Sequence, residues 1–412
     1  MVESAILDVG QRDIEARPAW REVYLLGALR GLSFGGDVMA ETAILLFLVK
    51  HGAAAYAVMA LLLAAAIPAA LLAPAAGAVS DRFDSKLIIT VVSALQALCC
   101  VAMVIWPSPV TLIALSVLLS AGLAFVQPVL AGLPRAMVGA ENVARASSIS
   151  QTAAMAGMIA APALAGVLIS RFGVRVPLVI DAASFAVVVA GGFIITTRLH
   201  AATSRHQQGE RLEPDDPDAP AEPAYRVRSD RFLWSVLTVA GTVIACVSMA
   251  NVFLAFYVLH TFHASGTTYG LIVSCEMAGL IIGGIAVGRA KKTRPEQVLV
   301  ITLLLLGVGV LGTGLAPTVW CIVPFYLIGG IGNGAMATEL HIVLSTRVPD
   351  SHRGRGFAAL GAISNTAPAV GYIIAGLILI AVAPRYAFIG AGVAALLCVL
   401  LFSRNLLRVS RR

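Results

Sequence analysis

The chain has 412 residues, of which 59% are hydrophobic and only 12% are charged, whereas about a quarter of the residues in ordinary soluble domains are charged. This apolar surplus excludes a soluble globular protein and leaves no room for a soluble domain of appreciable size. The net charge of +7 does not indicate a nucleic-acid partner, because the basic residues are scattered among short loops and the tail, without interleaved aromatic side chains.

The apolar residues fall into successive stretches that are long enough to cross a membrane. A hydrocarbon core about 30 Å thick needs about 20 apolar residues per helical span, and short polar or Gly/Pro-containing breaks separate the stretches. We therefore expect an all-α polytopic membrane protein. Its twelve predicted spans lie at residues 23–49, 54–79, 86–106, 109–134, 147–170, 176–197, 232–260, 268–289, 297–316, 319–345, 354–380 and 385–406.

The basic residues indicate how the chain is oriented in the membrane. With an even number of spans both termini lie on one side, and most of the 29 Lys and Arg residues fall in the loops and tails of that side. Because cytoplasmic loops carry an excess of Lys and Arg, we expect both termini to be cytoplasmic.

One long break, rich in Pro, Asp and Glu, divides the spans into two groups. It has too few apolar side chains to form a core, so we expect a flexible linker. The halves also resemble each other, since each has an Arg at the inner end of a helix (Arg135, Arg347) and a Pro in the next span (Pro162, Pro368), as in a duplicated fold. The expected organisation is a cytoplasmic segment at 1–22, six-helix bundles at 23–197 and 232–406, the linker at 198–231 and a cytoplasmic tail at 407–412.

The first span carries three charged residues, Arg30, Asp37 and Glu41. Spacings of seven and four residues place them on one helical face over about 16 Å, and we expect this face to line a central cavity. A charge at mid-bilayer costs at least about 2.5 to 3.5 kcal/mol, which makes such residues functional candidates. Two carboxylates one turn apart are not easily ionised together, so the pair could bind and release a proton. The alternative is a structural ion pair that braces this helix.

The second span ends in the segment GAVSDRFDSK. Gly77 would permit a close backbone approach, and Asp81 and Arg82 place opposite charges at a helix end, where they can pair with a neighbouring helix. The simpler interpretation is a polar turn that carries cytoplasmic charge.

This segment resembles the G-x-x-x-D-R-x-x-R/K-K signature of the major facilitator superfamily. The resemblance implies two six-helix bundles that rock around a central site. It also implies that the loop braces the bundles in the outward-facing state, with Gly77, Asp81 and Arg82 as a conformational latch. The sequence departs from the signature at Asp84 and Ser85, and the corresponding loop of the second half lacks the Asp-Arg pair.

The fifth span contains GMIAAPALAG, which is similar to the antiporter signature G-x-x-x-G-P-x-x-G-G. It retains Gly157, Pro162 and Gly166 but has Ala161 and Ala165 in place of glycines. Small residues would let helices approach closely and the proline would bend the span; the alternative is ordinary packing of an Ala-rich helix. Together with IDAASF and SHRGRGFAALGAI, the motif resembles the drug:H⁺ antiporter branch that includes macrolide and multidrug efflux proteins.

Further polar residues lie within later spans. Glu276 is near the middle of the eighth span, and Glu339 and His341 are in the tenth. Each could bind a cationic substrate, share the proton or make a structural contact between helices. Asp181, near the outer end of the sixth span, is interpreted as a cap or interface residue. The fourth span has Gln127 in place of the intramembrane Arg of many proton-coupled drug exporters.

Nothing in the sequence indicates catalysis. The six cysteines lie in apolar stretches without the spacing of a metal or redox site, and no phosphate-binding loop is present. The segment GLSFG lies in a predicted membrane helix, whereas a nucleophile elbow needs a strand–turn–helix. We expect a protein that is not an enzyme and that needs no metal and no cofactor.

The resemblance implies proton-driven efflux of hydrophobic or amphipathic small molecules, such as antibiotics, by alternating access. It implies a bacterial plasma membrane, and we expect a monomer whose partners are its substrate, protons and lipid. Two alternatives stay open: a specific siderophore or metabolite transporter, and a receptor or scaffold that kept the fold but lost transport.

Overall fold

The structure is a computed structural model that describes residues 19–80, 82–195, 197, 230–290, 295–348 and 352–409. Asp81 of the predicted latch, nearly all of the predicted linker and most of the predicted N-terminal segment lie outside the described residues.

The first half of the chain forms six membrane spans. Its helices are α2 (Trp20–Lys50), α3 (Ala55–Ser80), α4 (Ser85–Ile105), α5 (Pro109–Phe172) and α6 (Arg175–Ile194). Helix α5 has 64 residues and contains two spans, because the chain turns at Gly139, whose φ of 73° is outside the helical region and is one that glycine adopts without strain. Residues 135–146, which we expected between two spans, are therefore largely helical.

The second half also forms six spans. They are α8 (Arg231–Phe256) with its continuation η1 (Tyr257–Thr261), α9 (Gly266–Arg289), α10 (Pro295–Leu315), α11 (Ile322–Arg347) preceded by the short η2 (Val319–Cys321), α12 (Arg353–Ala381) and α13 (Pro384–Val409). In all, 12 described helices are long and apolar enough to cross a membrane. They overlap the predicted spans, and the described residues contain no strand, which confirms the predicted fold class.

Polar side chains begin several of these helices. The side chain of Asp84 accepts a hydrogen bond from the backbone N–H of Lys86, Asp230 does the same for Phe232 and Leu233, and Ser265 does so for Thr268. Such caps satisfy N–H groups that have no partner within the helix. Asp84, which departs from the signature described above, thus has a local role as the N-cap residue that precedes α4.

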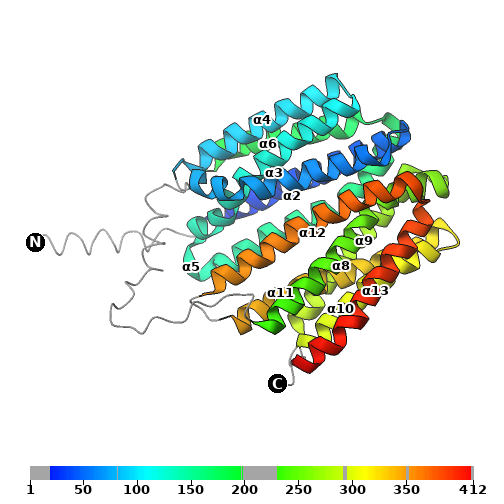
Figure 1. The fold of residues 1–412 in the computed structure, drawn as a ribbon. Coiled ribbons are helices and arrows are strands. Elements are labelled where there is room, and N and C mark those ends of the chain that lie inside the picture. The colour runs from blue at the N-terminus through cyan, green and yellow to red at the C-terminus, as the bar shows by residue number, and fades with distance from the viewer. Residues whose placement is uncertain are drawn as a thin grey trace, which may run out of the picture.

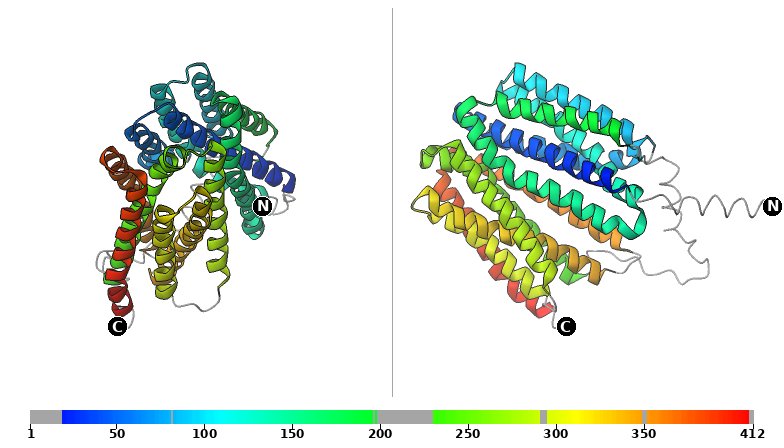
Figure 2. Two further views of the ribbon diagram at one scale, coloured as in Figure 1. Left: turned by 90° about the vertical axis from the view of Figure 1, so that its right-hand side faces the viewer. Right: turned by 180° about the vertical axis from the view of Figure 1, so that it is seen from behind.

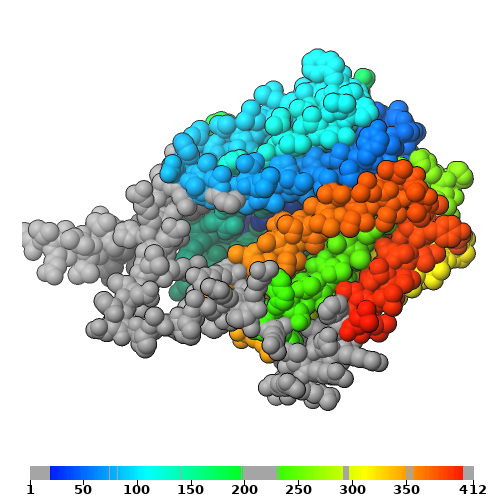
Figure 3. Space-filling view, viewed as in Figure 1, coloured from blue at the N-terminus to red at the C-terminus, as the bar shows by residue number. Residues whose placement is uncertain are grey.

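The two halves are in contact mainly near one end of the spans. We call the end of the bundle at which α2 begins the Trp20 end and the opposite one the Lys50 end. Across the halves α5 packs against α9 and α3 against α12, and the latter pair lies side by side in the space-filling view (Figure 3). In the ribbon, helices of the second half diverge from those of the first toward the Trp20 end (Figures 1 and 2).

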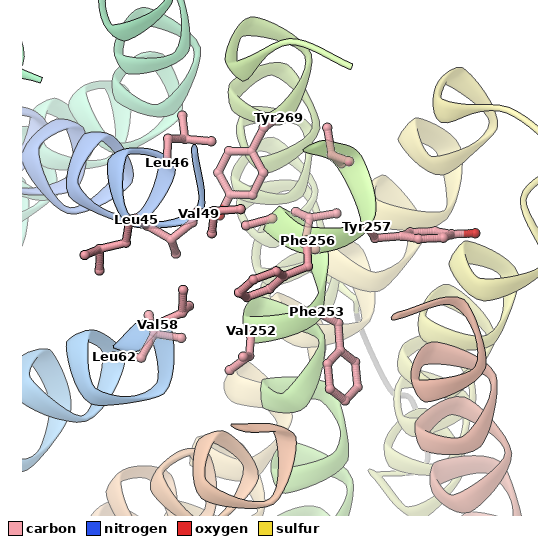
Figure 4. Packing of buried hydrophobic residues seen from close by; sticks show 14 of the residues in the cluster. Leu45, Leu46, Val49, Val58, Leu62, Val252, Phe253, Phe256, Tyr257 and Tyr269 are labelled. Carbon is pink, nitrogen blue, oxygen red and sulfur yellow. The ribbon is translucent and has the colours of Figure 1, made fainter. Parts of the chain in front are cut away.

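A hydrophobic cluster joins the halves at the Lys50 end. Leu46 and Val49 of α2 lie toward Tyr269 and Phe256 of the second half (Figure 4), and Leu45 belongs to the same cluster. Phe253 packs edge-on against Phe388, with ring centroids 5.5 Å apart. Because these side chains exclude solvent from both halves at once, the cluster favours a closed Lys50 end.

Candidate functional site

A first cavity, within the first half, is bordered by three acids. Asp37 and Glu41 of α2 and Asp181 of α6 line a space of about 650 Å³ that α3 and α5 complete. Asp37 lies within electrostatic reach of both other carboxylates. The structure therefore brings together the two acids that the sequence placed one turn apart and a third that it did not connect with them.

Asp181 is a buried residue of the helix interior and not a cap, so of our two interpretations the one as an interface residue between helices fits the structure. Helix α6 begins at Arg175, and the exposed fraction of Asp181 is 0%. Its carboxylate accepts a hydrogen bond from the thiol of Cys100 (3.3 Å) and one from the hydroxyl of Ser184 (3.4 Å). A Cβ at Gly36 would lie 2.5 Å from Asp181 Oδ1, so the glycine before Asp37 makes room for this carboxylate. An acid inside an apolar span was the signal that could have identified it.

Arg30 lies in a second cavity, which α2, α4, α5 and α6 enclose. This space of about 770 Å³ is mostly apolar, and Asp37 borders it as well. Arg30 Nη1 is 3.4 Å from the Ser150 hydroxyl, and its guanidinium carbon is 5.8 Å from the ring centre of Phe34. Its Nε is buried and has no hydrogen-bond partner within the described part of the chain. Arg30 and Asp37 thus border cavities that residues of the first half line, and the expectation that the charged face lines a central cavity between the halves stays a prediction for these two residues.

Glu41 differs, because it also lies near side chains of the second half. Tyr269 of α9 and Tyr372 of α12 are within electrostatic reach of both Glu41 and Glu276. The acids of the two halves are therefore linked by tyrosine rings at the interface. Sequence analysis did not identify these tyrosines, because nothing in their local sequence distinguishes them from packing residues.

Glu276 borders a third cavity, which lies in the second half. This space of about 320 Å³ is also lined by Asn251, Thr313 and Tyr326 and by apolar and aromatic side chains. The amide of Asn251 is 3.5 Å from the Tyr372 hydroxyl. Glu276 thus lies in a polar corner of a largely apolar cavity, as a candidate binding residue should.

The two polar residues of α11 do not join these sites. Glu339 is buried, with 2% exposure. Met336 and Leu340, near it on the same helix, belong to the hydrophobic core of the second half. His341 is exposed, and its Nδ1 is 2.8 Å from the Ala337 carbonyl oxygen. Neither residue borders the three cavities, so their role in binding stays a prediction.

The antiporter-like motif forms close helix contacts within and between the halves. A Cβ at Gly157 would lie 3.2 Å from backbone atoms of Gly31 and Gly35, which explains the glycines of GLSFG. Near Pro162 and Gly166 the helix crosses α9, where the Ala163 N–H donates to the hydroxyl of Ser274 over 3.1 Å. The motif residues therefore lie at the crossings of α5 with α2 and α9.

Of the three predicted latch residues, the structure describes Gly77 and Arg82, and both have open space beside them. A Cβ at Gly77 would meet no atom of the described residues within 4 Å, and Arg82 is exposed in the turn after α3. Among the residues that the structure describes, no group of three or more His, Cys, Asp or Glu is arranged to hold a metal ion.

Comparison with known proteins identifies the family. The profile of the Major Facilitator Superfamily matches residues 26–260 and 240–411. Macrolide efflux protein A of Streptococcus pyogenes is 24% identical over 383 residues, which cover 87% of this chain and 89% of that protein.

Solved structures of other transporters share the fold. The nucleoside transporter NupG matches with a TM-score of 0.74 at 13% identity, over 92% of this chain and 98% of that chain. A bacterial homologue of the iron transporter ferroportin in an inward-facing state matches with a TM-score of 0.69 at 16% identity, over 95% and 99%. At such identities the likeness shows the fold alone. Because the profile match covers nearly all of the twelve spans, this chain is a multi-pass membrane transporter that belongs to the Major Facilitator Superfamily.

Proposed function

We propose that this transporter exports hydrophobic or amphipathic small molecules and that proton entry drives the export. The observation that carries the proposal is the cavity shared by Asp37, Glu41 and Asp181. Carboxylates are costly inside a membrane and therefore mark functional sites there. Two of them in one cavity repel each other when both are ionised. A proton that binds among them removes this repulsion, and its release restores it.

Asp37 and Asp181 form the centre of this proton site. Among the residues that the structure describes, the side chains that donate to the Asp181 carboxylate are those of Cys100 and Ser184, which are neutral, and Asp37 makes no hydrogen bond or ion pair with another described side chain. Arg30 is directed to Ser150 and Phe34. The site therefore lacks the fixed positive charge that would hold both acids ionised, and this favours a reversible proton site over a structural ion pair.

The contact between the halves supports alternating access. With both termini in the cytoplasm of a bacterial cell, as the basic loops indicate, the closed Lys50 end faces outward and the diverging Trp20 end faces the cytoplasm. The segment of Gly77, Asp81 and Arg82 then lies at the open end. It would brace the two bundles when that end closes, in accord with the open space beside Gly77 and the exposure of Arg82 here.

The class of substrate follows from the cavities and from one relative. The two larger cavities have mainly apolar linings, which discriminate weakly between apolar substrates. The similarity to a macrolide efflux protein favours export of antibiotic-like molecules. A transporter for one siderophore or metabolite would instead move a single compound, and a scaffold would move none.

The test is transport by the purified protein in liposomes, with and without an imposed pH gradient. We expect several unrelated amphipathic drugs to move against their gradients when the pH gradient is present. Asp37→Asn should abolish this uphill transport but keep exchange of labelled for unlabelled drug, because exchange needs no net proton movement. Glu141→Gln, at an exposed acid, is the matched control and should behave as wild type. Uphill transport by Asp37→Asn would contradict the proton role, and exchange of no drug at all would contradict efflux.

A further inference from the structure

The Glu276 cavity combines one acid with aromatic rings. Helices α8 to α11 and α13 form it, and its polar side chains are Asn251, Glu276, Thr313 and Tyr326. Phe325 and Phe388 lie on its apolar walls. The cavity is smaller than the two in the first half, and it admits a small head group more readily than a whole drug molecule.

Tyr326 supplies an independent indication of a ligand. Its side chain is 7% exposed, and its buried hydroxyl has no hydrogen-bond partner among the described residues. A buried hydroxyl without a partner costs about 1 to 3 kcal/mol, and nearly all such groups in proteins are satisfied. Because Tyr326 lines the cavity that Glu276 borders, a polar group bound there would satisfy it.

No described side chain of the cavity carries a positive charge to balance Glu276. The titratable groups within electrostatic reach of Glu276 are Tyr269 of α9, Tyr326 of α11 and Tyr372 of α12. Tyr269 and Tyr372 are also within reach of Glu41 across the interface. Arg385 of α13 does not line the cavity, since its Nε donates to the Gly314 carbonyl over 3.3 Å. A cation that pairs with Glu276 in this cavity would therefore come from the ligand.

The surroundings of Glu276 suit an organic ammonium group better than a metal ion. Metal ions such as Ca²⁺ take about six to eight oxygen ligands, whereas this cavity offers few oxygen atoms and several ring faces. An ammonium group within about 6 Å of an aromatic face gains cation–π attraction, and its N–H can donate to a carboxylate and to a tyrosine hydroxyl.

We propose that Glu276 binds the protonated amine of an amphipathic substrate. The Tyr326 hydroxyl accepts a second N–H or a water-bridged hydrogen bond from this amine. The apolar body of the substrate lies toward Tyr269 and Tyr372, between the halves. The inference rests on the proposed efflux function, since it specifies what is exported. It separates the substrate acid, in the second half, from the proton-binding acids in the first.

The test uses two ligands that differ at one nitrogen. Erythromycin carries a single tertiary amine that is protonated at neutral pH, and its N-oxide has the same body without that charge. Binding of each to the purified full-length protein in lipid nanodiscs is measured by calorimetry. We expect wild type to bind the amine at least about tenfold tighter, the difference that one charge-assisted hydrogen bond supplies.

The variants decide whether Glu276 is responsible. Glu276→Gln, which keeps the shape of the side chain, should bind both ligands equally, and Tyr326→Phe should weaken the amine more than the N-oxide. Glu141→Gln should retain the full preference. A preference that persists in Glu276→Gln overturns the inference, as does binding that depends on sodium ions and not on the amine.

The outcome also separates this inference from the proposed function. If wild type exports drugs in a pH-dependent manner but prefers neither ligand, only the amine site is wrong. If wild type binds neither ligand and transports no drug, both proposals fail.

Discussion

Replacing Gly270 by alanine should open the Lys50 end of the transporter. Gly270 of α9 lies at the crossing with α5, where a Cβ would be 2.8 Å from the carbonyl carbon of Pro162 and 3.1 Å from the Cα of Ala163. Carbon atoms prefer a separation of about 3.5 to 4.0 Å. The atoms it would meet are backbone, so neither helix can relieve the contact by rotating a side chain.

The size of the effect follows from the fact that this contact joins the two halves. Overpacking costs about 1 to 3 kcal/mol, and here the cost falls on the closed conformation alone. The ratio of closed to open molecules should drop by about 5- to 150-fold. The gain in helix propensity from Gly to Ala, about 1 kcal/mol, is present in both conformations and therefore cancels.

Double electron–electron resonance can measure the opening. Spin labels at Tyr56 of α3 and Tyr386 of α13, which are 63% and 68% exposed, report the distance between the halves at the Lys50 end. The native cysteines are replaced first, Cys100 by serine so that Asp181 keeps a donor. We expect Gly270→Ala to add or enlarge a population at longer distance.

Gly288→Ala is the matched control. Gly288 is on the same helix, but a Cβ there would meet no described atom within 4 Å, so the distance distribution should remain that of wild type. Identical distributions for Gly270→Ala and Gly288→Ala would refute the argument that this glycine contact holds the Lys50 end closed.

Two further substitutions test the proton site and the latch. Gly36→Ala would place a Cβ 2.7 Å from the Ser184 hydroxyl and 2.5 Å from Asp181 Oδ1. We therefore expect reduced uphill drug transport in liposomes, with exchange retained. The control is Gly361→Ala, where a Cβ meets no described atom within 4 Å; the same loss of transport in this variant would show that the effect is not specific. Gly77→Val should leave the melting temperature of the protein unchanged, because the added side chain has open space in this conformation. It should slow transport, because closure of the Trp20 end would bring a neighbouring helix against the added side chain. An unchanged initial rate of efflux would argue against the latch.

The number and position of the spans follow from the sequence with little ambiguity. In a bilayer every backbone N–H and C=O must be satisfied by hydrogen bonds within the protein, which leaves helices and closed barrels, and an uninterrupted apolar stretch of about 20 residues indicates a helix. The common face of Asp37 and Glu41 follows in the same way, because positions four residues apart in a helix share a face. These features depend on the local chain alone.

The partners of these residues were decided by tertiary packing. Asp37 meets Asp181 because Gly36 allows α6 to come close. Glu276 shares a cavity with Tyr326 because glycines of α9 and α11 let those helices cross closely. At this crossing a Cβ at Gly279 would lie 2.9 Å from the Ile331 nitrogen. Hydropathy reports that a helix is in the membrane but not how it is rotated or which neighbour it touches. The rotation of a helix and its neighbours are fixed by contacts between small residues on helices far apart in the chain. For that reason the sequence by itself determined the spans and the candidate acids, whereas only the tertiary structure decided which acids share a cavity.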